Sequence, residues 1–462
     1  MVASAGVGPS VKTKGSSQPV VTRGAPSEAA ARWPDVVRVP FGGAHAAVTR
    51  ILFRQAVSRL PVRVEMGAQV LGGGGLSDPV MRIVRPDDFF ARVGRYGLIG
   101  FGESFQAGDW EALPPVQPVP GRGEDPLVEL LTVFATRLAR LVPPALQRLR
   151  RFATLRQPRS DENTPDGSRS NIARHYDLSN DLFSTFLDPT LTYSSALFDE
   201  EVGNTWSDLE PAQLRKIDRL LDECRVGAGS RVLEIGTGWG HLALRAAQRG
   251  AVVHSITLSE EQLCLARKRV ADAGFEDQVT IELCDYRAVQ GVYDAIVSVE
   301  MIEAVGEAYW PTYFATIDRC LAPGGSAGIQ AITMPHDRLI VSRRTWTWIQ
   351  KYVFPGGLIP SVEAFRHAVA GTSLRVTSDL SFGPAYAETL RLWRERFTAA
   401  SGELEALGFD EIFHRMWTFY LAYSEAGFRS RYLDVHQFVL RRPTVRDRGV
   451  HHSAPEGEVE TS

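Results

Sequence analysis

The feature that most constrains the fold is a regular alternation of short apolar strands and amphipathic helices from residue 231 onwards. The strand in "RVLEIGTGWG" (231–240) runs into a glycine-rich turn, and a glycine closes the helix "HLALRAAQRG" (241–250) that follows. The later segments of the same kind are "AVVHSITLS", "EEQLCLARKRVADAGF", "VTIELCDY", "YDAIVSVEMIEAVG", "GGSAGIQAITMP" and a last strand, "HQFVLRR". Such alternation predicts an α/β fold with a mostly parallel sheet between two helical layers. Ligands bind such sheets at the carboxyl ends of the strands.

The glycine-rich turn indicates a cofactor site. Glycines allow the backbone to turn sharply and to approach a ligand closely. A dinucleotide fingerprint would need glycine at position 241, where this chain has His241, and an acid at the end of the second strand. That strand instead runs into Thr257, Leu258 and Ser259, with Gln262 one helical turn later. The pattern therefore fits S-adenosylmethionine better than NAD, and it disfavours an NAD oxidoreductase. Glu234, inside the first strand, either braces the turn or contacts the ligand.

The remaining chain divides into smaller zones. We expect disordered tails at 1–35 and 446–462, a small α+β N-terminal domain at 36–130, a basic helix and linker at 131–170, and the cofactor domain at 171–445. In the N-terminal domain, 42–60 reads as helix and 62–75 as a strand with the hairpin turn at Gly72 to Gly75. The four cysteines have no metal-ligand spacing, so we expect reduced thiols and no metal site.

The N-terminus has no apolar signal segment, and no stretch approaches the roughly 18 apolar residues of a membrane span. Between Arg137 and Arg159 the chain carries seven arginines, no acid and several interleaved leucines. Such a segment is attracted to anionic lipid headgroups, but a solvated helix face or a bridge to an acidic protein surface explains it equally well. No aromatic platform accompanies the arginines, so nucleic acid is disfavoured.

Five ordered motifs give the chain a family resemblance. They are "HYDLSNDLFSTFLDPTLTYSSALFDE" (175–200), "VLEIGTGWG", "TLSEEQ", "SVEMIEAVG" and "WIQKYVFPGGLIPS". Over about 160 to 445 the chain resembles the cyclopropane-fatty-acyl-phospholipid synthases and mycolic-acid-type methyltransferases. The resemblance implies a class I, Rossmann-like methyltransferase fold with a seven-stranded sheet. It also implies methyl transfer from S-adenosylmethionine to the double bond of an unsaturated acyl chain, in many members that of a phospholipid.

The resemblance also assigns residues to the cofactor. By position they are Tyr193, Ser194, Glu234, Gly236, Thr237, Gly238, Trp239, Gly240, Thr257, Leu258, Ser259, Gln262, Asp285 and Tyr286. We expect the Tyr193-Ser194 segment to lie across the charged end of the methyl donor, where an aromatic face tolerates positive charge.

In the cyclopropane-forming members, the resemblance implies a bound bicarbonate that acts as the base. The positions that would hold it are Ser195 in place of a cysteine, Glu303, Gln330 in place of a histidine, Ile332 through its backbone, and Tyr386. Glu303 is expected to act as the base or as its anchor. The two exchanged side chains disfavour a cyclopropane product, because glutamine carries no charge.

The pattern looks more like the branch that makes 10-methylene fatty acyl chains, the precursors of tuberculostearic-type acids. A separate reductase would saturate the product. The alternatives are cyclopropane formation and, in another functional class, a lipid-binding protein without catalysis. We expect a cytoplasmic enzyme, peripherally associated with the inner face of the membrane and acting on its phospholipid acyl chains. The sequence leaves the oligomeric state open and is compatible with a homodimer.

Overall fold

The fold is described from a computed structural model that covers residues 28–117, 125–141, 157–158, 161–164, 167–169, 171, 179–199, 204–343 and 345–444. The expected tail 446–462, residues 1–27 of the other expected tail, the pair His175-Tyr176 and most of the arginine-rich segment lie outside these described residues. Disorder up to residue 35 is wrong for 28–35, which form a helix and the start of a second one and are tied to the rest of the chain by the bond from Trp33 Nε1 to Asp410. Within the described residues, no helix combines the length and the apolar character that crossing a membrane requires.

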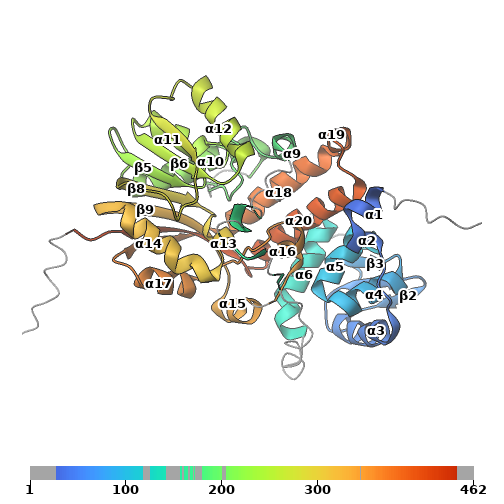
Figure 1. Ribbon diagram of the computed structural model, residues 1–462. Helices are drawn as coiled ribbons and strands as arrows, with labels where there is room; N and C mark the ends of the chain where they lie inside the picture. The colour runs from blue at the N-terminus through green and yellow to red at the C-terminus, as the bar shows by residue number, and fades with distance from the viewer. Residues whose placement is uncertain are drawn as a thin grey trace, which may run out of the picture.

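The N-terminal part is a small α+β unit around a four-stranded sheet, in the order β2-β1-β3-β4 (Figure 1). Its strands are β1 (Arg63–Met66), β2 (Gln69–Leu71), β3 (Val80–Ile83) and β4 (Trp110–Leu113). Its helices are α1 (Glu28–Arg32), α2 (Pro34–Val37), α3 (Gly43–Val57), α4 (Pro86–Tyr96), α5 (Leu98–Gln106) and α6 (Pro126–Leu141).

The glycine run in this unit does not form the expected hairpin turn. The β1–β2 turn is at Gly67 and Ala68, because Met66 pairs with Gln69 across it. Gly72 to Gly74 follow β2 and lie against the backbone of residues 58 to 63; a Cβ on Gly72 would come within 2.1 Å of the Val62 carbonyl oxygen. The glycines are thus needed for close backbone contact rather than for the hairpin.

The larger part is a seven-stranded mixed sheet in the order β10-β11-β9-β8-β5-β6-β7. Its strands are β5 (Arg231–Ile235), β6 (Val252–Thr257), β7 (Val279–Leu283), β8 (Tyr293–Val299), β9 (Leu321–Thr333), β10 (Arg375–Ser381) and β11 (Asp434–Arg441). The strands from β9 to β7 are parallel, and β11 is antiparallel to both of its neighbours. The expected α/β methyltransferase sheet is therefore confirmed, with one reversed strand.

Helices cover both faces of this sheet (Figure 1). Val232 and Val297 pack with α10 (Trp206–Glu223), α11 (His241–Gln248) and α12 (Glu260–Asp272). Their neighbours Leu233 and Ile296 pack on the other face with α14 (Trp310–Cys320) and α17 (Val362–Ala370). Successive strand residues point to opposite faces, so an apolar run such as "RVLEI" supplies both layers.

The two parts share one hydrophobic core. Helices α9 (Asn180–Phe186), α18 (Gly383–Ala399) and α20 (Glu411–Arg429) contribute to the cluster that also holds the N-terminal sheet. Figure 1 shows α20 between the large sheet and α5 and α6. The remaining short helices are α13 (Ile302–Val305), η2 (Glu307–Tyr309), α15 (His336–Ser342), α16 (Trp348–Tyr352) and α19 (Ser401–Ala406).

Candidate active site

A cavity of about 130 Å³ that opens in part to solvent lies at the carboxyl ends of β5, β6 and β8. Eleven of the residues assigned to the cofactor line it: Tyr193, Ser194, Glu234, Gly236, Thr237, Gly238, Trp239, Thr257, Leu258, Gln262 and Tyr286. A cavity at the strand ends of an α/β sheet is where a cofactor is expected.

The glycine-rich turn is shaped by positive backbone φ angles. Gly236 has a φ of 97° and Gly238 a φ of 52°. A Cβ on Gly236 would lie 2.5 Å from Met301 Cγ, whereas one on Gly238 would meet nothing within 4 Å. A side chain at position 236 would collide with Met301, so glycine is required there. A Cβ at position 238 would meet no other atom, so there is free space beside this part of the turn.

Glu234 braces this turn. Its Oε2 accepts a hydrogen bond from Ser255 Oγ, which lies 2.7 Å from Thr237 Oγ1. The residue is buried, and this burial raises the pKa of its carboxyl to about 8. Glu234 also lines the cavity, so both of the roles considered for it remain compatible with its position.

The end of β6 carries hydroxyl and amide groups where a dinucleotide site would have an acid. Thr257 Oγ1 donates to Gln262 Oε1 at 3.0 Å, which turns the amide NH2 of Gln262 away from Thr257. Ser259 caps α12 by accepting a bond from the Gln262 backbone. The NH2 group of Gln262 is a donor suited to a ribose hydroxyl.

Three residues assigned to the cofactor lie outside the cavity wall. Gly240 is the N-cap of α11, and Ser259 is the N-cap of α12. Asp285 makes an ion pair with Arg287 at 2.6 Å, while its neighbour Tyr286 lines the cavity. A cofactor role for these three residues stays a prediction.

The residues expected to hold an anionic base gather around a carboxylate that the sequence did not single out, Glu300. Its Oε1 accepts bonds from the Ser195 backbone N–H at 2.9 Å and from Gln330 Nε2 at 2.8 Å. Its Oε2 accepts a bond from the Tyr386 hydroxyl at 2.7 Å. Glu300 directly follows β8 and lines the cavity.

Glu303 lies one helical turn further on, in α13. Its Oε1 accepts a short bond from the Ile332 backbone N–H, and its Oε2 has no partner within the described residues. Burial, followed by repulsion from Glu300, raises the pKa of the Glu303 carboxyl to about 8. The expected group of Ser195, Glu303, Gln330, Ile332 and Tyr386 is thus brought together around two carboxyl groups.

A second residue at the cavity that the sequence did not single out is Lys216 of α10. It is fully buried, lines the cavity and donates to Ser194 Oγ at 2.7 Å. Burial lowers the pKa of Lys216 to about 8, and the charges of Glu300 and Asp188 oppose this shift. The sequence could have indicated that this lysine is buried, because it shares one helix face with apolar residues. The residues of this face recur at helical spacing and are all buried: Leu209, Gln213, Lys216 and Leu220.

Aromatic rings pack beside the cavity and these carboxyl groups. The ring centroid of Tyr193 lies 5.3 Å from that of Trp393, and Trp393 meets Tyr386 edge-on at 6.2 Å. A second group of rings, which includes Trp348 and Tyr352, packs against the N-terminal unit, where Trp348 Nε1 donates to Gln106. Of the first set, Tyr193 lines the cavity, so its ring is the one that can face a positively charged ligand there.

Comparison with known proteins agrees with this geometry. The family model for mycolic acid cyclopropane synthetase matches residues 163–438. The tuberculostearic acid methyltransferase UfaA1 of Mycobacterium tuberculosis is 52% identical over 419 residues, which is 89% of this chain and 95% of the relative. The cyclopropane-fatty-acyl-phospholipid synthase of Escherichia coli K12 is 35% identical over 368 residues, which is 78% of this chain and 87% of the relative.

Two solved structures resemble the larger part of the chain. The cyclopropane synthase MmaA2 from Mycobacterium tuberculosis gives a TM-score of 0.55 at 32% identity and covers 59% of this chain and 98% of that chain. The mycolic acid cyclopropane synthase CmaA1, complexed with SAH and CTAB, gives 0.54 at 30% identity and covers 62% and 99%. SAH is what remains of S-adenosylmethionine after it has given up its methyl group. The chain therefore belongs to the mycolic acid cyclopropane synthetase family and is an S-adenosylmethionine-dependent methyltransferase.

Proposed function

We propose that the protein methylates the double bond of an unsaturated, oleoyl-type acyl chain in a phospholipid and releases a 10-methylene fatty acyl product. The observation that carries the proposal is the 52% identity to a tuberculostearic acid methyltransferase over 89% of the chain. The placement of a carboxylate and aromatic rings beside the cofactor cavity supports it, because a methylated alkene is a cation that must then lose a proton.

Bound S-adenosylmethionine supplies an electrophilic methyl group, and the chain's own residues have three tasks beside it. Gln262 and the turn at 236–240 hold the donor, while the ring of Tyr193, which lines the cavity, faces the cation that forms on the acyl chain. A hydride shift then moves the positive charge to the carbon that carries the new methyl group. A carboxylate removes a proton from that methyl group, and the C–H electron pair becomes the exocyclic double bond.

Product analysis tests the proposal directly. The protein is incubated with S-adenosylmethionine and dioleoyl phosphatidylglycerol vesicles, and the released fatty acids are analysed by NMR. The cyclopropane and methylene products have equal mass, so mass spectrometry counts turnover and NMR distinguishes them. Exocyclic methylene protons support the proposal, whereas cyclopropane protons overturn the methylene assignment. Absence of any added carbon favours the alternative of a lipid-binding protein without catalysis.

We further propose that the enzyme reaches its substrate by binding an anionic membrane surface through α3. Val48, Ile51 and Leu52 on this helix are 45–60% exposed, and Phe41 just before it is 94% exposed. Between residues 36 and 64 the chain has five arginines and no acid. Arg50 on α3 pairs with the exposed carboxylate of Asp87 at 2.8 Å, whereas Arg54 donates to the neutral amide of Gln69. Apolar side chains beside such arginines are complementary to an anionic lipid surface.

Vesicle sedimentation tests this surface. Phe41→Asp combined with Ile51→Asp should reduce binding to dioleoyl phosphatidylglycerol vesicles at least tenfold. Val292→Asp, which changes an exposed apolar residue on the loop before β8, is the matched control and should bind as the unmodified protein does. Equal binding by all three proteins would exclude α3 as the membrane contact. A cytoplasmic location, a separate reductase and a homodimer remain expectations beside these proposals.

A further inference from the structure

The carboxylate of Glu300 already uses the groups expected to hold bicarbonate. The Ser195 amide, the Gln330 amide and the Tyr386 hydroxyl all donate to Glu300, and the Ile332 amide donates to Glu303. The Ser195 hydroxyl donates to the Ala196 carbonyl oxygen. No donor of the expected set is left for a free anion, and a second negative charge would meet two carboxyl groups. The residues present therefore do not fit bicarbonate.

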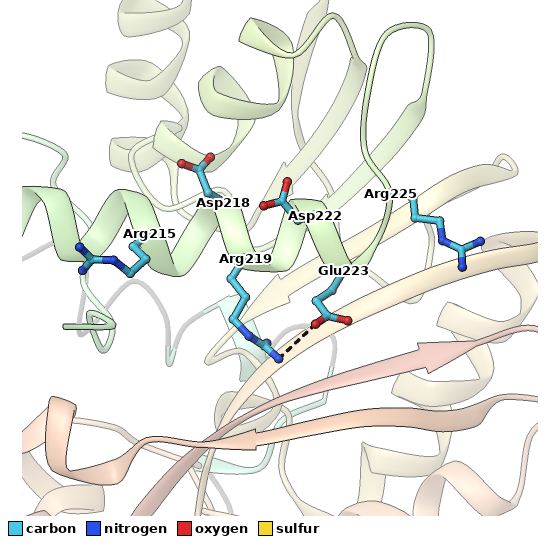
Figure 2. Close-up of a pocket in the computed structure, with 6 residues that line it drawn as sticks. All are labelled: Arg215, Asp218, Arg219, Asp222, Glu223 and Arg225. Atoms are coloured by element: carbon cyan, nitrogen blue, oxygen red, sulfur yellow. Dashed lines mark hydrogen bonds and ion pairs between the residues drawn. The ribbon is translucent and has the colours of Figure 1, made fainter. Parts of the chain in front are cut away.

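A chain of side-chain amides fixes the direction of the Gln330 donor. Arg219 of α10 points towards the neighbouring strands (Figure 2), and its Nη1 donates to Gln437 Oε1 at 2.7 Å. Because arginine can only donate, the NH2 of Gln437 faces away from it and donates to Gln330 Oε1 at 3.0 Å. The NH2 of Gln330 is then directed at Glu300. The glutamine in place of the family's histidine is thereby oriented as a donor to a carboxylate.

The backbone at Glu300 is held in a costly conformation. Its φ is 52°, in the left-handed region that residues with a Cβ seldom adopt. The Glu300 N–H donates to the Gln330 carbonyl oxygen at 2.8 Å, which ties this turn to β9. Strained residues of this kind persist where the surrounding structure holds them, most often at functional sites. Here the strained turn carries the carboxylate that the three donors hold.

We propose that the carboxylate of Glu300 replaces bicarbonate as the general base, so that the enzyme works without a bound anion. In the reaction of the proposed function, on which this step rests, the C–S bond of the donor breaks and its electron pair stays on sulfur. The alkene π electrons form the new C–C bond, and a hydride moves to the adjacent carbon with its electron pair. Glu300 then takes a proton from the transferred methyl group and becomes a neutral carboxylic acid.

Of the two carboxyl groups, Glu300 is the better placed to carry the negative charge. Two buried carboxyls close to each other favour a state in which one of them holds a proton. Glu300 receives three donors and feels the charge of Lys216, whereas Glu303 receives one backbone donor and has one oxygen without a partner in the described part of the chain. Burial raises the pKa of the Glu300 carboxyl, which makes it a stronger base once it is ionised.

The first test needs no variant. Methyl transfer is measured in buffer freed of carbon dioxide, and again with bicarbonate added at millimolar concentration. We expect the rate to change by less than twofold. A rate that falls tenfold or more without bicarbonate, and that bicarbonate restores, would overturn the proposal while leaving the proposed methyl transfer intact. Absence of methyl transfer in both buffers would instead contradict the proposed function, which keeps the two failures distinguishable.

The second test removes the carboxylate of Glu300. Glu300→Ala should lower turnover about 10²-fold or more, in line with the loss of a general base. Bicarbonate or formate should then restore at least a tenth of the activity, because the freed donors can hold a small carboxylate. Glu303→Gln is the matched comparison and should not be rescued. If Glu300→Ala keeps full turnover, or if the two variants respond equally to bicarbonate, the proposal fails.

A binding measurement gives a readout that does not depend on turnover. The ¹³C NMR signal of labelled bicarbonate should remain unbroadened by the unmodified protein and broaden with Glu300→Ala. If Glu300→Ala does not fold, turnover is compared between Glu300→Gln and the unmodified protein, because glutamine keeps the shape of the side chain. The proposal would be overturned if the unmodified protein binds bicarbonate and Ser195→Trp, a change beside Glu300, prevents this binding.

Discussion

Replacing Glu234 with glutamine should change how stability depends on pH. The carboxyl is 3% exposed, and its burial raises its pKa from the ordinary value of 4.5 to about 8. Between these two pH values the folded protein keeps a proton that the unfolded chain releases. The free energy of unfolding therefore falls as pH rises, by roughly 1.4 kcal/mol for each pH unit.

Across the whole interval this cost amounts to roughly 5 kcal/mol, which is a large part of the net stability of a typical domain. Glu234→Gln removes it, since glutamine does not titrate and its carbonyl oxygen still accepts the bond from Ser255. We expect the variant to match the unmodified protein near pH 4.5 and to be more stable by several kcal/mol near pH 8.

Urea unfolding at pH 5, 6, 7 and 8 measures this difference. Other buried acids titrate in both proteins, so the difference between the two unfolding free energies isolates Glu234. Parallel pH dependences would refute the reasoning, because they would mean that Glu234 is ionised in the folded protein at neutral pH.

Three further changes test other contacts. Lys216→Met removes a positive charge that lowers the pKa of Glu300, which also faces Glu303, Tyr386 and Gln330. The acidic limb of the plot of kcat/KM against pH should therefore move to higher pH. An acidic limb that does not move would count against this coupling between Lys216 and Glu300. Gln437→Leu removes the hydrogen bond that orients the amide of Gln330, so kcat should fall about tenfold. The affinity for the cofactor, measured by calorimetry, should stay unchanged. A variant that loses only cofactor affinity would contradict the role given to the Gln437–Gln330 bond. Lys351→Met leaves the fully buried Glu103 without its ion-pair partner and should lower the free energy of unfolding by about 3 kcal/mol. Adding Glu103→Gln to the same chain should recover part of this loss. If it recovers none, the loss comes from the packing of the Lys351 side-chain stem and not from the ion pair.

The parallel strands and the cofactor turn could be predicted from the sequence because each is a local pattern. Apolar strand residues such as those of β5 serve both faces of a buried sheet, and the spacing of Gly236, Gly238 and Gly240 marks a turn close to a ligand. Strand β10 was missed, since "RVTSDLS" has no apolar run and lies at the sheet edge with alternate residues exposed. Its place in the sheet is decided by pairing with β11, far away in the sequence.

The base that we propose, Glu300, is not the one expected from the sequence, for a related reason. Glu303 was singled out by its match to the family, and Ser195, Gln330 and Tyr386 were assigned to a bicarbonate that their donors do not leave room for. Nothing local to "VSVEMIEAVG" distinguishes Glu300 from an acid that simply ends a strand. The donors that identify it come from the segment after α9, from β9 and from α18, so its role is visible only after folding.

The link from Arg219 through Gln437 and Gln330 has a consequence for the end of each catalytic cycle. Imidazole can pass a proton from one ring nitrogen to the other, but a primary amide cannot do so at neutral pH. The proton gained by Glu300 therefore has no exit along this link to the surface. It has to depart by way of the cofactor cavity, so regeneration of the enzyme should be tied to product leaving and water entering.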